Sequence, residues 1–116
     1  MLYINGTEVQ LTRGDTAYLK IPLRLKLYDD NGEPYYEPYE MKPEDTLTLT
    51  VKKSTKDTVV CFQKETKGSN VFHIKPEDTC DCEFNKYTYD VEIHTNGDTF
   101  TVIEPSCFKI LPEVTC

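Results

Sequence analysis

A strict two-residue alternation over residues 17–28 restricts the fold of this chain more than any other feature. One set of positions is apolar: Ala17, Leu19, Ile21, Leu23, Leu25 and Leu27. The other set is polar, basic or aromatic: Tyr18, Lys20, Pro22, Arg24, Lys26 and Tyr28. A period of two indicates a β-strand with one buried face, because side chains on one face of a helix recur about every 3.6 residues. Pro22 cannot donate to a strand ladder, so the strand is predicted to lie at a sheet edge or to be broken there.

Other segments show the same alternation and are separated by turn residues. Further strands are predicted at residues 2–4, 8–11, 46–51, 58–64, 71–74, 86–93, 99–103 and 107–111. Asn5-Gly6 predicts a hairpin between the first two strands, because both residues accept positive φ. In residues 46–51 threonines alternate with apolar residues and are expected on the solvated face.

The pentapeptide Lys-Pro-Glu-Asp-Thr occurs twice, at residues 42–46 and 75–79. Residues 13–16 have the same Asp-Thr ending. Each Asp-Thr borders an alternating stretch, which indicates turns whose aspartate bonds the backbone amides just after it. No segment has the pattern of an amphipathic helix, so these turns are expected to form single helical turns at most.

The strands and turns predict a single all-β domain over residues 1–116. Short strands with turn signals about every ten residues indicate an immunoglobulin-like antiparallel β-sandwich of about seven to nine strands. Tyr87 and Tyr89 support this prediction, because a tyrosine two residues before an inward position of the sixth strand is typical of such domains. The core is predicted to contain Leu19, Ile21, Leu23, Leu25, Leu49, Val51, Phe72, Tyr89, Val91, Ile93, Phe108 and Ile110.

A tyrosine-rich segment is the candidate contact surface for another protein. Tyr35, Tyr36 and Tyr39 lie in a stretch with Pro34 and Pro38, which is expected to form a loop after the turn at residues 29–32. Tyrosine has a large rigid ring with a polar tip and is enriched at protein interfaces. The alternative is that two of these rings cap the core. The C-terminal strand, residues 108–114, is a second expected contact segment, because an exposed edge strand can pair with the strand of a neighbour.

Charge and hydropathy exclude several classes of partner. The net charge of -7 repels nucleic acid and disfavours anionic membranes. No apolar run approaches the roughly 18 residues of a membrane span, and the N-terminus lacks the pattern of a signal peptide. The five cysteines are odd in number, so reduced thiols are expected, all of them free. Cys80 and Cys82 are spaced too closely for a common zinc site.

No pattern of catalytic residues is present. The two histidines, His73 and His94, lie in predicted strands, and the acidic pairs lie in turns. Nucleophile elbows, phosphate-binding glycine loops and zinc-protease sequences are missing. We therefore expect no enzymatic activity, no cofactor and no metal.

Several segments, spread over nearly the whole chain, carry a family resemblance by their order and spacing. They are residues 3–6, 11–16, 45–53, 72–74, 87–91, 101–106 and 113–115. Together they resemble the small immunoglobulin-like domains encoded in tail and baseplate gene clusters of phages and prophages of Gram-positive bacteria, akin to the N-terminal domain of baseplate upper proteins. The chain departs from those proteins in being a stand-alone domain, and its insertion around residues 35–39 is longer than the usual tight turn.

The resemblance implies a non-enzymatic virion structural role, with no catalytic residues to transfer. The implied partners are other phage tail or baseplate proteins, with a homo-oligomer left open. The implied location is the virion, after synthesis in the bacterial cytoplasm. The alternative is a carbohydrate-binding or adhesion module that uses residues 35–39; the missing Trp and signal peptide count against it.

Overall fold

The computed structural model describes residues 2–5, 7–53, 60–80, 82 and 86–112, and strands account for most of them. The elements are β1 (Leu2–Asn5), β2 (Glu8–Thr12), β3 (Ala17–Lys20), β4 (Arg24–Tyr28), β5 (Pro34–Pro38), β6 (Thr46–Lys52), β7 (Val60–Lys67), β8 (Val71–Ile74), α1 (Pro76–Thr79), β9 (Lys86–Thr95) and β10 (Asp98–Leu111). The prediction of an all-β chain is confirmed.

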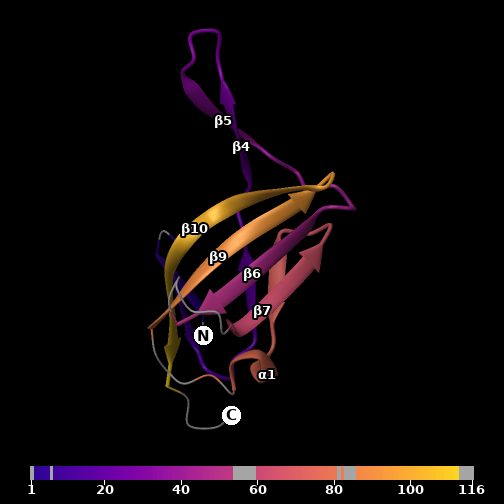
Figure 1. The fold of residues 1–116 in the computed structure, drawn as a ribbon. Coiled ribbons are helices and arrows are strands. Elements are labelled where there is room, and N and C mark those ends of the chain that lie inside the picture. The colour runs from indigo at the N-terminus through magenta and orange to yellow at the C-terminus, as the bar shows by residue number, and fades with distance from the viewer. Residues whose placement is uncertain (1, 6, 54–59, 81, 83–85, 113–116) are drawn as a thin grey trace.

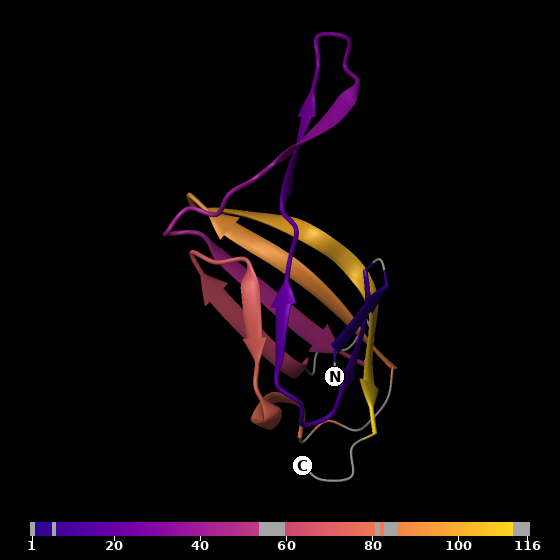
Figure 2. The same cartoon turned by 180° about the vertical axis from the view of Figure 1, so that it is seen from behind.

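The strands form a two-layer sandwich. One layer is a six-stranded sheet in the order β1-β2-β10-β9-β6-β7. The pair β3–β8 lies across one face of this sheet, as Figure 2 shows from behind the view of Figure 1. The predicted sandwich is therefore confirmed, and the hairpin predicted at Asn5-Gly6 is present as the antiparallel pair β1–β2.

The structure differs from the predicted sandwich in two details. The described residues contain ten strands rather than seven to nine, and β10 pairs with β2 in parallel rather than antiparallel fashion. The strand count is higher because the segment over residues 17–28 is divided into β3 and β4, and because β5 is an additional strand. The parallel pair follows from the length of β10, which pairs with β9 and at its end also with β2. Register shifts between Thr101 and Ser106 interrupt its pairing with β9, and such irregularities bend a strand.

The core lies between the two layers and contains the inward residues of both. Of the predicted core residues, all but Leu25 are buried, and the side chain of Leu25 lies outside the described part of the structure. Phe108 occupies the centre, where its ring packs edge to face against Phe62 and Tyr89 with centroids 5.7 Å apart in each pair. Tyr89 also donates a hydrogen bond to the carbonyl of Thr7, which ties β9 to the turn between β1 and β2.

The alternating segment over residues 17–28 is broken at Pro22, as its lack of an N–H predicts. It forms β3 and β4 with an extended link between them. Ile21 N donates to Asn70 O at 2.8 Å, and Leu23 O accepts from Tyr39 N at 3.1 Å. The odd-numbered residues thus keep their hydrogen bonds through the break, while the partner strand changes from β8 to β5.

The prediction of a loop at residues 35–39 is wrong, because β5 is a strand paired with β4. Proline is tolerated in an edge strand, and the tyrosines favour extended backbone. The predicted turn at residues 29–32 closes this hairpin: Asp29 Oδ1 accepts from the backbone N–H groups of Asn31 and Glu33, each at 2.9 Å. Gly32 supplies the positive φ of 79° that the turn needs.

The two copies of the repeated pentapeptide form the same turn, although not with the predicted hydrogen bond. Asp45 Oδ2 accepts from the N–H of Lys42 at 3.0 Å, and Asp78 Oδ2 accepts from the N–H of Lys75 at 2.7 Å. Each aspartate therefore bonds the amide three residues before it, not the amides after it. The second copy forms the single helical turn α1.

The prediction that all five thiols are free is also wrong. Cys61 of β7 and Cys82, after α1, form a disulfide with Cα atoms 6.4 Å apart, a separation that suits such a bond. Cys80 is disulfide-bonded too, and Cys107 is the free cysteine in the described part of the chain. Cys116 lies outside the described residues. The pairing was not visible in the sequence because the fold, not the spacing, brings β7 beside the segment after α1.

Candidate protein-contact surface

The β4–β5 hairpin projects away from the sandwich (Figure 1) and carries two of the three predicted contact residues. Tyr28 lies opposite Pro34, and Arg24 lies opposite Pro38. Opposed residues of an antiparallel pair share a face, as do alternate residues of one strand. Tyr36, midway between the prolines, therefore projects from the same face. We call this group of five residues the contact face.

The contact face consists of aromatic rings, prolines and one arginine, and it is open to solvent. Tyr28 is 63% exposed and Tyr36 is 60% exposed, although both rings are large enough to form the centre of a buried core. All five residues of β5 are exposed. Solvent exposure of large rings in one patch is typical of a surface that another molecule covers.

Tyr35 lies on the opposite face of the hairpin, across from Leu27. It is 42% exposed, and Glu37, two residues further along β5, shares this face and is also exposed. The hairpin therefore presents rings on both faces, with the larger exposed area on the contact face.

Tyr39 does not belong to the exposed group. It is half-buried at the base of the hairpin, packs against the core together with Met41, and donates a hydrogen bond to Asp45 Oδ2. The alternative that rings of this segment cap the core thus describes Tyr39, whereas Tyr35 and Tyr36 remain on the surface. The hydrogen bond raises the pKa of the Tyr39 hydroxyl, and the same bond is the first cause of a lowered pKa at Asp45.

Tyr28 is the aromatic residue of the contact face that the sequence prediction did not include. The sequence did indicate that Tyr28 faces outward, because it belongs to the polar, basic or aromatic set of the alternation over residues 17–28, after Arg24 and Lys26. The prediction of a loop at β5 concealed the link, because only strand pairing brings Tyr28 beside Pro34 and Tyr36.

The C-terminal strand, expected as a second contact segment at residues 108–114, is not available as a sheet edge over its described part. Residues Phe108–Leu111 pair with β2 on one side, and Phe108 and Lys109 also pair with β9 on the other. Val114 lies outside the described residues.

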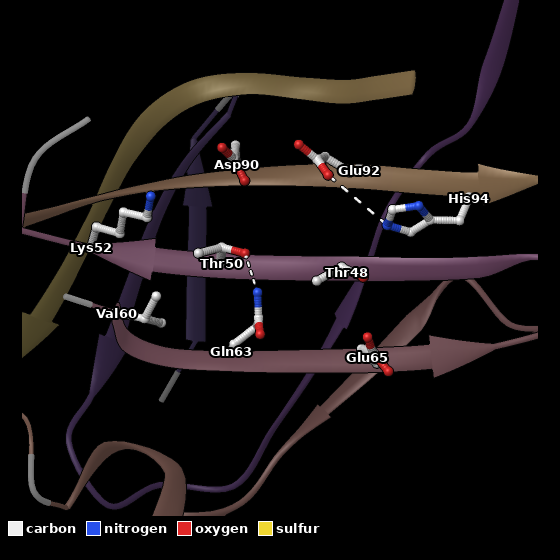
Figure 3. A pocket seen from close by; sticks show the side chains of 9 residues that line it. All are labelled: Thr48, Thr50, Lys52, Val60, Gln63, Glu65, Asp90, Glu92 and His94. Carbon is white, nitrogen blue, oxygen red and sulfur yellow. Dashed lines mark hydrogen bonds and ion pairs between the residues drawn. The ribbon is translucent and has the colours of Figure 1, made fainter. Parts of the chain in front are cut away.

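A second surface lies on the outer face of the large sheet, where β9, β6 and β7 run side by side (Figure 3). An open groove there is lined by Thr48, Thr50, Lys52, Val60, Gln63, Glu65, Asp90, Glu92 and His94. Thr48 was predicted to face solvent, but it is buried, with only 8% of its surface exposed. The reason is that Glu65 of β7 and Glu92 of β9 lie directly beside it, one on each side. Its hydroxyl has no hydrogen-bond partner.

Two pairs of polar groups in this groove contact one another. Gln63 Nε2 donates to Thr50 Oγ1 at 2.9 Å, and His94 Nε2 lies 4.0 Å from Glu92 Oε2. Burial, and then the nearby charge of Glu92, raise the pKa of Asp90. Within the described residues no group of three His, Cys, Asp or Glu side chains could hold a metal ion. The arrangement is that of a solvated sheet face, and the hairpin is the stronger candidate site.

The two histidines lie apart. His73, on β8, is exposed and stacks on Tyr18 with ring centroids 4.6 Å apart. His94, on β9, bonds Thr99 Oγ1 through Nδ1 at 2.9 Å. Each histidine therefore contacts its strand neighbours, and the two do not form a common site.

No family model, curated protein or solved structure matches this chain significantly. In the part of the chain that the structure describes, no helix has the length and apolar character needed to cross a membrane.

Proposed function

We propose that this protein acts by binding another protein through the β4–β5 hairpin, without turning over a substrate. The observation that carries the proposal is the contact face: two tyrosines, two prolines and an arginine exposed on a hairpin that projects from the sandwich. Tyrosine and arginine are the residue types most often found at energetic centres of interfaces.

The hairpin is also suited to binding because little of it needs to become ordered. Its strands are paired over five positions, and its turn is fixed by the side chain of Asp29. At its base, Tyr39 is held by Asp45. A surface that is already ordered loses less conformational entropy on association.

The more specific proposal is that the protein is a virion structural module of a phage tail or baseplate. Its support is the order and spacing of the sequence segments that resemble such domains. The Cys61–Cys82 disulfide is compatible with this location, because disulfides persist on virion and cell surfaces and are rare in the reducing cytosol.

A carbohydrate-binding module is the second candidate. The observation in its favour is that Tyr28 and Tyr36 offer two exposed rings on one face, and sugars stack on such rings. A glycan array separates the two candidates: reproducible sugar binding that disappears in Tyr36→Ala would favour this one.

The test of the proposal is a pull-down with proteins encoded in the same gene cluster. We expect wild type to capture one of them and Tyr28→Ser/Tyr36→Ser to capture at least about tenfold less, as loss of an interface centre implies. Phe100→Ser is the matched control, because Phe100 is an aromatic residue 56% exposed on the β9–β10 hairpin. Equal capture by wild type and the double variant would overturn the hairpin assignment. A hydrolytic activity lost on changing one acidic residue would overturn the non-enzymatic role.

A further inference from the structure

The hydrogen-bond pattern of the β4–β5 hairpin determines which backbone groups point outward. Asp29 N donates to Glu33 O at 3.0 Å at one end, and Tyr39 N donates to Leu23 O at 3.1 Å at the other. Hydrogen-bonded and non-bonded pairs alternate along an antiparallel ladder. Between these ends, the pair of Leu25 with Glu37 is therefore hydrogen-bonded. The pairs that Arg24, Lys26 and Tyr28 form with β5 are non-bonded pairs.

The outer edge of β5 is closed to further pairing. Its outward positions are Pro34, Tyr36 and Pro38, the partners of the non-bonded pairs. Proline has no N–H, so two of the three outward positions cannot donate to an added strand. Proline at such positions is a known protection of sheet edges.

The outer edge of β4 is open. The N–H and C=O groups of Arg24 and Lys26 point away from β5, and neither residue is proline. Among the described elements, β5 is the one that packs extensively against β4, and Figure 1 shows the hairpin standing clear of the sandwich. The two edges of the hairpin therefore differ in their capacity to accept a strand.

We propose that the outer edge of β4 accepts an extended segment of the partner protein as an added strand, and that this segment carries acidic residues. The inference rests on the proposed function and specifies how the hairpin would bind. Added strands gain affinity from main-chain hydrogen bonds and specificity from alternate side chains. The charged residues of β4 itself are Arg24 and Lys26, both basic, whereas the acidic residues of the hairpin lie in its turn or on β5: Asp29, Asp30, Glu33 and Glu37.

A second copy of this chain fits the edge less well. A symmetric antiparallel pair centred on Lys26 would place this residue opposite the same residue of the other copy. Like charges directly opposite one another in a sheet are destabilising. Lysine on an edge strand thus disfavours self-association and favours a strand of opposite charge.

The test uses the whole protein and a short synthetic peptide in which glutamate and valine alternate. Its twin, with lysine in place of glutamate, is the control for charge. In nuclear magnetic resonance titrations we expect the glutamate peptide to shift the amide signals of Arg24 and Lys26, and the lysine peptide to bind at least about tenfold more weakly. Binding of neither peptide, equal binding of both, or shifts confined to the β5 edge would overturn the proposal.

Two variants at one position separate the hydrogen bond from the charge. Lys26→Pro removes an outward N–H and the charge but no β4–β5 hydrogen bond, whereas Lys26→Thr removes the charge alone. We expect Lys26→Pro to weaken peptide binding about tenfold beyond Lys26→Thr, because only the former loses the ladder bond and introduces a ring at the edge. Equal affinities of the two variants would overturn added-strand binding.

Hydrogen exchange in the wild type gives a readout that does not depend on any variant folding. The amides of Arg24 and Lys26 should exchange fast in the free protein and slow with the glutamate peptide, while the amide of Leu25 is protected in both states. Slow exchange at Arg24 and Lys26 in the free protein would overturn the open edge.

Concentration-dependent dimerisation abolished by Lys26→Pro would replace the acidic partner by a second copy. If the tyrosine double variant loses a captured partner and Lys26→Pro does not, the added-strand inference fails while the proposed function stands.

Discussion

At the residue scale, Asp45 is a fully buried carboxylate at the base of the hairpin, and its ionisation is coupled to folding. The hydroxyl of Tyr39, then that of Thr95 and the N–H of Lys42, hold the pKa of Asp45 below its usual value. Because the pKa is lower in the folded state, the charged carboxylate stabilises the fold at every pH above the unfolded-state pKa of about 3.9. This contribution is lost as the pH falls through the pKa of the folded state.

We therefore predict that Asp45→Asn lowers the free energy of unfolding at neutral pH and flattens its dependence on pH below about pH 4. Tyr39→Phe should act in the same direction, since it removes the first cause of the lowered pKa. Urea unfolding across the acid range measures both effects, with Asp30→Asn in the exposed hairpin turn as the control. An unchanged acid limb in Asp45→Asn would contradict the coupling.

The core residues were predictable from their period alone, and their energetic weight can be tested singly. Leu23 and Val91 are buried, the latter completely. We expect Leu23→Ala and Val91→Ala each to cost about 2–4 kcal/mol of unfolding free energy, from lost burial and the cavity left behind. Val60→Ala, at a position 38% exposed, should cost much less. Urea unfolding of the three variants checks this, and equal costs at all three positions would contradict the assigned core.

At the scale of elements, the repeated pentapeptide shows where sequence reasoning succeeds and where it stops. Both copies predict a turn, and both form one in which the lysine N–H donates to the aspartate side chain. Their surroundings differ: Asp45 is fully buried beneath Tyr39, whereas Asp78 pairs with Lys64 at 3.0 Å near the surface. Local chemistry specifies the turn, but burial depends on segments that the fold brings together from elsewhere.

The same limit applies to the site. Alternation identified the outward residues of β4, and composition singled out Tyr35 and Tyr36. The pairing of β4 with β5 was not predicted, because a segment with two prolines reads as a loop unless its partner strand is known. The contact face exists only in that pairing, so it could not be predicted from the sequence.

The disulfide is also a property of elements, since it joins β7 to the segment after α1 across 21 residues. We predict that denatured protein purified without reductant has at most two titratable thiols, because three of the five cysteines, Cys61, Cys80 and Cys82, are disulfide-bonded. The double variant Cys61→Ser/Cys82→Ser should be less stable by about 3 kcal/mol, the chain-entropy effect of a loop of this length. Cys107→Ser is the control, because Cys107 is a free thiol. Five titratable thiols would contradict the bond.

At the scale of the whole molecule, the hairpin makes the protein elongated. The principal extents are 55 × 27 × 26 Å and the radius of gyration is 15.4 Å. A compact chain of this length would have a radius of gyration of about 13 Å. The core lies in the sandwich, and every residue of β5 is exposed, so the hairpin adds surface while contributing little to the buried core.

This separation predicts that the hairpin can be removed without unfolding the sandwich. Replacing residues 26–36 with Asn-Gly keeps Tyr39 and Asp45 and closes the strands with a tight turn. We expect an unchanged strand spectrum by circular dichroism, a melting temperature within about 4 °C of wild type, and a radius of gyration near about 13 Å by X-ray scattering. Partner capture should be lost together with the hairpin.

If the shortened protein unfolds or melts far below wild type, the hairpin stabilises the fold. If it still captures the partner, binding occurs elsewhere on the sandwich. A shortened protein that keeps its fold and loses its partner would assign stability to the sandwich and recognition to the hairpin.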